Sequence, residues 1–270
     1  MKNIRIPMAL VVVAVLVLAL PLVASANNSW GKYHWNISTA DSIDAPLGFG
    51  DNLTTSAWNT SLAGASSDWN ASVLKNNVVT GGTNTACDPV LGSVEVCNDE
   101  YGETGWLGIA QIWVYRGRAG HIAQALVKVN DTFFNSPLYN TQAWRDFVVC
   151  QEVGHTLGLA HQDEDFDNKN IGTCMDYTSD PNGPPSNLHP DQHDLDVLTG
   201  KYAHLNGTDD DDGGKKGNNG GGKGKKGEPP GQDVRQWGKA ISTDGKGRPD
   251  LFEKDLGNGD KLFTHVLWAD

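Results

Sequence analysis

The stretch CQEVGHTLGLAH, residues 150–161, decides how the rest of this chain is interpreted. On an α-helix, residues four apart lie on one face, so Gln151 and His155 would point the same way, one turn apart. Glu152 would lie about 100° round the helix axis from Gln151, close enough to hold a water molecule beside a bound ion without binding that ion itself. The spacing therefore predicts a helix that carries two metal ligands and an acid on neighbouring faces.

Gly158 predicts where this helix ends. Glycine tolerates the left-handed backbone conformation that terminates helices, and the chain can then reverse so that His161 approaches the same point from another side. Three side chains would converge there and leave the fourth corner of a tetrahedron open, as in catalytic zinc sites. We therefore expect Gln151, His155 and His161 to surround one metal ion.

The motif QEVGHTLGLAH resembles the metzincin signature H-E-x-x-H-x-x-G-x-x-H, with Gln151 in the place of the first histidine. A second part of the resemblance follows in GTCMDYTS, residues 172–179. There, Met175 and Tyr177 are similar to the Met-x-Tyr turn of the astacin and serralysin branches. The resemblance extends over roughly residues 30–205, but only the segment from the helix to Tyr177 is specific.

This resemblance implies an α+β fold, namely a metzincin-like (zincin) domain with a twisted mixed β-sheet, an active-site helix and a C-terminal helix. It implies that one Zn²⁺ ion is bound by Gln151, His155 and His161. It also implies that Glu152 is the general base and that Tyr177 assists the tetrahedral intermediate. The expected function is that of a zinc metalloprotease, a hydrolase that cleaves a protein or peptide substrate with a metal-activated water.

Gln151 departs from the family pattern. Its side chain offers a neutral carbonyl oxygen, whereas zinc prefers nitrogen, sulfur or carboxylate oxygen, so we expect weaker zinc binding and competition from other divalent ions. Further ligands are available from the acidic run at residues 163–165 and from His189 and His193, although the simpler interpretation of each is a solvated surface residue. Two other functions stay open: a catalytically inactive pseudopeptidase that binds extracellular protein or peptide through the retained groove, and a carrier whose residues 234–270 do the binding.

The four cysteines are Cys87, Cys97, Cys150 and Cys174, and the sequence alone allows three pairings. A bridge between Cys87 and Cys97 would close the short loop DPVLGSVEV. In the fold that the resemblance implies, Cys150 and Cys174 each adjoin the floor of the metal site. A disulfide bond between them would therefore tie the metal-binding helix to the Met turn.

The first residues resemble a secretory signal. Lys2 and Arg5 precede an apolar run that ends in small residues, so we expect cleavage after Ala26 and a secreted, extracellular protein with no membrane insertion. The formal net charge is −12, and it becomes −14 once Lys2 and Arg5 are removed. Such an acidic chain has no electrostatic attraction to nucleic acid. We expect the mature protein to be a monomer.

The composition predicts four segments: a signal peptide (1–26), a metzincin-like catalytic domain (27–206), a Gly/Lys/Asp-rich flexible linker (207–233) and a short β-rich C-terminal segment (234–270). Apolar spacing predicts helices over 53–72, over 141–157 and from about residue 190, and strands over 30–38, 73–79, 108–115 and 121–130. The C-terminal segment would form two or three short strands, either docked on the catalytic domain or added to a sheet edge.

Overall fold

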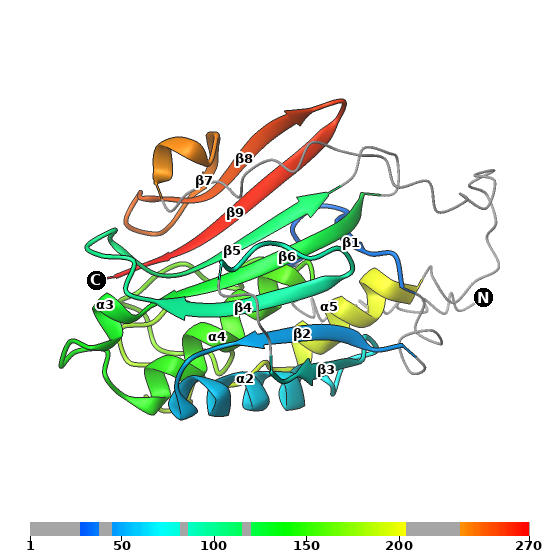
Figure 1. The fold of residues 1–270 in the computed structure, drawn as a ribbon. Helices are drawn as coiled ribbons and strands as arrows, with labels where there is room; N and C mark the ends of the chain where they lie inside the picture. Colours follow the sequence, from blue (N-terminus) through cyan, green and yellow to red (C-terminus); the bar gives the residue numbers. More distant parts are fainter. Residues whose placement is uncertain (1–27, 38–44, 82–85, 115–119, 204–232, 270) are drawn as a thin grey trace, which may run out of the picture.

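The computed structural model describes residues 28–37, 45–81, 86–114, 120–203 and 233–269 (Figure 1). The expected signal peptide lies outside these residues, and so does the expected linker apart from Asp233. The described residues form an α+β fold around one mixed sheet, which confirms the expected fold class at that level.

The sheet runs in the order β3-β2-β4-β6-β5-β9-β8-β7, and β1 pairs with β6. Pairs among β1, β2, β3, β4 and β6 are parallel. Strand β5 is antiparallel to both its neighbours, β6 and β9, and the C-terminal strands continue antiparallel. The strands are β1 (His34–Trp35), β2 (Leu47–Asn52), β3 (Asn76–Val79), β4 (Ser93–Asp99), β5 (Trp106–Val114), β6 (His121–Asn130), β7 (Lys239–Thr243), β8 (Pro249–Gly257) and β9 (Asp260–Trp268).

Two long helices, α2 (Ser56–Trp69) and α4 (Gln142–Thr156), pack against each other and against the sheet (Figure 1). Each begins at a threonine whose side chain accepts a hydrogen bond from a backbone N–H in the first turn, Thr55 for α2 and Thr141 for α4. Helix α5 (Gln192–Tyr202) begins with a capping box between Asp191 and Asp194. The short helices are α3 (Asp131–Phe134) and the 3-10 turn η2 (Val234–Gln236).

The buried apolar residues form two clusters. The larger one fills the space between the sheet and the helices α2 and α4, with Trp69, Phe147 and Val153 among its members. The smaller cluster lies on the opposite face of the C-terminal half of the sheet, because neighbouring strand residues point to opposite faces. Its members are Trp106, Ile109, Trp237, Phe252 and Val266.

Most of the predicted elements are present. The helices predicted over 53–72, over 141–157 and from residue 190 correspond to α2, α4 and α5, and the strands predicted over 73–79, 108–115 and 121–130 correspond to β3, β5 and β6. The strand predicted over 30–38 is wrong in extent, since only His34–Trp35 pairs with β6. Gly31, at a φ of 57°, makes a turn that interrupts the alternating pattern there.

The C-terminal segment extends the main sheet. Strand β9 pairs with β5 from Trp106↔Trp268 to Val114↔Lys261, and β8 and β7 follow outside it. Of the two placements left open by the sequence, addition to a sheet edge is therefore the one observed. This places β9 next to the strand that packs on α4.

Two disulfide bonds join Cys87 to Cys97 and Cys150 to Cys174, which are the two bridges considered from the sequence. They are compatible with an exported protein, since exported proteins fold in oxidising surroundings. Among the described residues, we find no helix with the length and apolar character needed to span a bilayer.

Candidate metal centre

The end of α4 and the turn after it bring His155 and His161 close together. His155 lies in the last turn of α4, and Gly158 follows with a φ of 101°, in the region that favours glycine. A Cβ atom at Gly158 would lie 2.6 Å from the carbonyl oxygen of Tyr33. The helix therefore ends where the sequence predicts, and the chain reverses toward His161.

Replacement of Gly158 by alanine tests this turn. We expect Gly158→Ala to lower the free energy of unfolding by about 1 to 3 kcal/mol, because the positive φ and the contact with Tyr33 both oppose a side chain. The matched control is Gly64→Ala in the middle of α2, where an added Cβ atom would have no neighbour within 4 Å. That control should gain about 0.5 to 1 kcal/mol. Urea unfolding of both variants measures the difference, and a Gly158→Ala variant as stable as Gly64→Ala would contradict it.

The rings of His155 and His161 lie side by side, with centroids 4.6 Å apart and planes at 88°. Nδ1 of His155 is 2.8 Å from the carbonyl oxygen of Leu159, so a proton on Nδ1 donates to that oxygen and Nε2 keeps its lone pair. Metal-binding histidines are usually oriented by a hydrogen bond of this kind.

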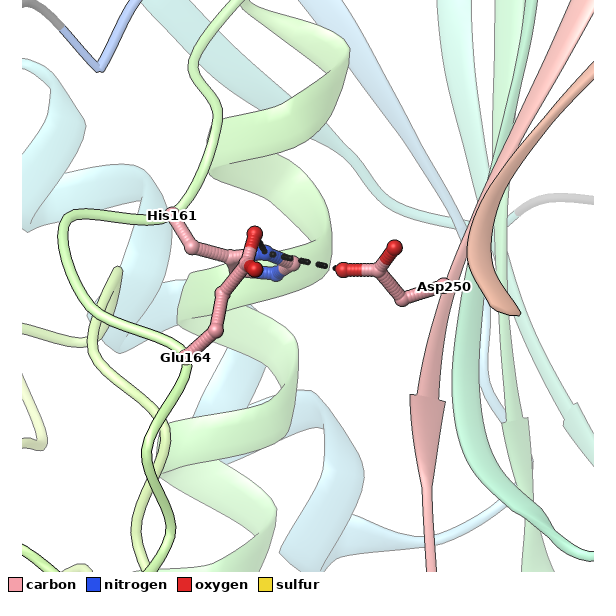
Figure 2. A group of neighbouring side chains, drawn as sticks. All are labelled: His161, Glu164 and Asp250. Carbon is pink, nitrogen blue, oxygen red and sulfur yellow. Dashed lines mark hydrogen bonds and ion pairs between the residues drawn. The ribbon is translucent and has the colours of Figure 1, made fainter. Parts of the chain in front are cut away.

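Two carboxyl groups lie close to Nδ1 of the His161 ring. Nδ1 of His161 is 3.3 Å from Oε1 of Glu164, and 3.6 Å from Oδ2 of Asp250, which extends from β8 on the opposite side (Figure 2). The ligand atoms of these three residues all lie within 4.8 Å of one another, so the group itself has the dimensions of a cation site. The other ring nitrogen of His161, Nε2, is buried without a hydrogen-bond partner.

The segment around Met175 packs directly against α4. An added Cβ atom at Gly154 would lie 2.6 Å from Sδ of Met175, so only glycine permits this close approach. Nε2 of Gln151 donates to the carbonyl oxygen of Cys174 at 2.9 Å, and the Cys150–Cys174 disulfide bond joins the same two segments. This hydrogen bond fixes the Gln151 amide and leaves its Oε1 buried and unpartnered.

Glu152 and Tyr177 are both fully buried beside these ligands. The Glu152 side chain packs over Gly108 of β5, where an added Cβ atom would lie 2.9 Å from Oε1. Neither carboxyl oxygen of Glu152 has a hydrogen-bond partner. The ring of Tyr177 lies 4.2 Å from that of His161, and the Tyr177 hydroxyl donates to the carbonyl oxygen of Val266 at 3.4 Å.

The unpartnered atoms identify what the cluster lacks. A buried polar atom without a hydrogen bond costs about 1 to 3 kcal/mol. Within the described part of the chain, this region collects unpartnered atoms from five residues: Gln151 Oε1, Glu152 Oε1 and Oε2, His161 Nε2, Asp250 Oδ1 and His265 Nε2. Imidazole nitrogens and carboxylate or amide oxygens are atoms that bind divalent cations in proteins, so the residues present could hold a divalent cation.

Burial disfavours the charged forms of these groups when no cation is bound. It raises the pKa of Glu152 well above its ordinary value, and it lowers the pKa of His155 well below its ordinary value, with a further contribution from His161. It also lowers the pKa of His161 to about 3 and raises the pKa of Asp250 to about 6. The His161–Asp250 contact is therefore not a strong ion pair at neutral pH, despite its short distance. A divalent cation would favour ionised Glu152 and needs unprotonated histidines.

The other ligands considered from the sequence lie in different surroundings. Glu164 contacts His161 as described above, whereas Nδ1 of His189 pairs with Asp68 at 2.7 Å on the surface. His193 belongs to a separate group with Asp191 and Asp194 whose ligand atoms also lie within 4.8 Å of one another. Asp163 and Asp165 lie in the loop after His161. The Asp163 side chain accepts a hydrogen bond from the backbone N–H of Asp165, and the Asp163 backbone forms an isolated β-bridge with Asp176.

Asp250 and His265 were missed as site residues from the sequence. Both lie in the C-terminal segment, far along the chain from the motif, and they reach the cluster only because β9 pairs with β5. The one sequence signal was in KLFTHVLW, residues 261–268, where His265 shares a face with Phe263 and Leu267. A histidine in the middle of an apolar strand face is an unusual core residue.

No protein-family model matches this chain, and no curated protein matches it. What the site does is therefore argued from its residues and their geometry.

Proposed function

We propose that this chain is a secreted zinc-dependent endopeptidase of the metzincin type. The observation that carries the proposal is the pair of adjacent imidazoles on α4 and the following turn. Each has its Nδ1 held by an oxygen acceptor, and fully buried Glu152 lies beside them. The disulfide bonds and the expected signal peptide support the extracellular assignment.

Zinc would be held by His155, His161 and Gln151, the last through the Oε1 atom that its hydrogen bond to Cys174 leaves unpartnered. Bound there, zinc would supply Lewis-acid polarisation of a water molecule and of the peptide carbonyl group. Because an amide oxygen is a weaker zinc ligand than an imidazole, the site should bind zinc less tightly than three histidines would.

Glu152 would act as the general base. Its carboxylate takes the proton of the attacking water and delivers it to the nitrogen of the leaving amine. It is suited to this role because no hydrogen bond occupies either oxygen, and burial raises the pKa of its carboxyl group above the ordinary value, which makes the carboxylate a stronger base. Tyr177 would donate its hydroxyl proton in a hydrogen bond to the developing negative oxygen of the substrate.

Metal analysis and peptide hydrolysis together test the function. We expect one zinc ion per purified chain, and hydrolysis of a mixed peptide library that stops when a chelator removes the ion and returns when zinc is added. Gln151→His should bind zinc at least about 10-fold more tightly, because an imidazole replaces the amide oxygen. A wild type that is inert and metal-free, but gains zinc and activity in Gln151→His, would instead support the pseudopeptidase.

A further inference from the structure

The C-terminal hairpin of β8 and β9 contacts the candidate centre through two adjacent residues of β9. The ring of His265 stacks on that of His155, with centroids 4.1 Å apart and planes at 13°. The backbone carbonyl of Val266 accepts a hydrogen bond from the Tyr177 hydroxyl at 3.4 Å. One strand therefore contacts two of the residues that the proposed chemistry needs.

Strand β8 adds a contact on another side of the centre. Oδ2 of Asp250 lies 3.6 Å from Nδ1 of His161 (Figure 2). In this conformation the side chains of Gln151, Glu152 and Tyr177 are buried, and each residue is 0% exposed. A peptide bond has to touch these groups to be cleaved, so the described conformation excludes a peptide substrate.

The edge of β5 is occupied as well. Strand β9 pairs antiparallel with β5 from Trp106↔Trp268 to Val114↔Lys261. An open strand edge is where an extended peptide can join a sheet through main-chain hydrogen bonds. Because the Glu152 side chain packs over Gly108 of β5, the strand edge that β9 fills is the one beside the proposed general base.

The C-terminal strands form a unit of their own. Strand β7 pairs with β8 and β8 pairs with β9, and among the described strands only β9 joins this unit to the rest of the sheet. The unit supplies Trp237, Phe252 and Val266 to the smaller apolar cluster, in which they pack with residues of β5. This cluster lies on the sheet face away from the centre, so docking of the unit can be weakened there without changing a site residue.

We propose that the C-terminal hairpin is a built-in inhibitor: it fills the edge of β5 and covers the centre, and a peptide reaches the centre only in chains whose β9 has left β5. This inference rests on the proposed peptidase function. Release would expose Phe263 and Leu267, which are buried in the main core, so the open fraction of chains is small. The hydrolysis rate of the full-length protein is then set by how firmly the hairpin docks.

Weakening the smaller apolar cluster in the zinc-loaded, full-length protein tests the proposal. Phe252→Ala removes a ring that packs on Trp237 with centroids 5.3 Å apart, and Phe252→Leu removes less of that contact. We expect kcat/KM for peptide hydrolysis to rise at least about 10-fold in Phe252→Ala and less in Phe252→Leu, because weaker docking enlarges the open fraction. The matched control is Phe134→Ala, which removes a buried ring that packs on Trp58 in the main core. It should not raise kcat/KM.

Hydrogen exchange measures docking independently of activity. Amide exchange in β9 should be fastest in Phe252→Ala, slower in Phe252→Leu and slowest in the wild type, while the amides of α4 stay protected. Hydrolysis that rises in the same order supports the inhibitory role. Hydrolysis that stays at the wild-type rate in both Phe252 variants, or that rises without faster β9 exchange, would overturn the inference and leave the peptidase function standing. A zinc-loaded series in which no member cleaves peptide would overturn both.

Discussion

Glu152→Gln should reduce peptide hydrolysis by a factor of about 10² to 10⁴, the usual contribution of a general base. Glutamine has nearly the same shape, so it keeps the packing over Gly108, but its amide cannot take a proton from water. Because Glu152 is not a metal ligand in the proposed site, zinc binding should be unchanged. Loss of activity with retention of zinc is therefore the expected combination.

The chain offers a matched control for this substitution. Glu95 of β4 is also a buried glutamate, but its two carboxyl oxygens accept hydrogen bonds from Asn52 and Ser93, away from the cluster. Glu95→Gln should leave the hydrolysis rate within a factor of about two of the wild-type rate. Its main effect should be a lower free energy of unfolding. Initial rates at saturating zinc compare the two variants. Equal rates for wild type and Glu152→Gln would remove Glu152 from the mechanism.

The paired substitution Cys150→Ser with Cys174→Ser should have the second large effect. The disulfide bond joins residues separated by 24 positions, and loss of such a cross-link costs about 3 kcal/mol of stability through the greater entropy of the unfolded chain. It should also weaken zinc binding, because the bond fixes α4 to the segment whose Cys174 carbonyl accepts from Gln151. Thermal unfolding and chelator competition measure the two effects separately.

The second disulfide bond is the control. Cys87 and Cys97 are separated by 10 positions, so this bond closes a shorter loop. Cys87→Ser with Cys97→Ser should therefore cost slightly less stability than the first pair, with a difference of at most about 1 kcal/mol. This bond joins Cys87 to Cys97 of β4 and does not touch α4 or Cys174, so its loss should not change zinc affinity. Equal zinc affinities for the two double variants, measured where both are folded, would show that the Cys150–Cys174 bond does not support the metal site.

The helices were the most predictable part of the fold. Helices α2 and α4 have apolar residues at helical spacing and begin at threonine caps, so each local signal agrees with the final structure. Strands β2 and β4 were not predicted. Strand β2, LGFGDN, contains two glycines, which are depleted in strands, and β4 carries Glu95 in its interior. These strands form because their neighbours in the sheet bury them, a constraint that local sequence does not express.

The site residues also fall into a part that the sequence predicts and a part that it does not. The convergence of His155 and His161 and the turn at Gly158 follow from helix geometry, because these residues lie within one turn or one reversal of each other. The positions of His265 and Asp250 near these residues depend on the pairing of β9 with the edge of β5, two segments more than a hundred residues apart in the sequence. Sequence patterns indicated that the C-terminal segment forms strands, but they did not specify which edge those strands join.

The most direct measurement is a zinc titration of the metal-free full-length protein, with His155→Ala plus His161→Ala as the test variant and His189→Ala as the control. The account predicts one tight zinc ion per chain in the wild type and in His189→Ala, and its loss in the double variant. Tight zinc binding that survives removal of both motif histidines, or a folded wild type that binds no zinc, would contradict the proposed centre.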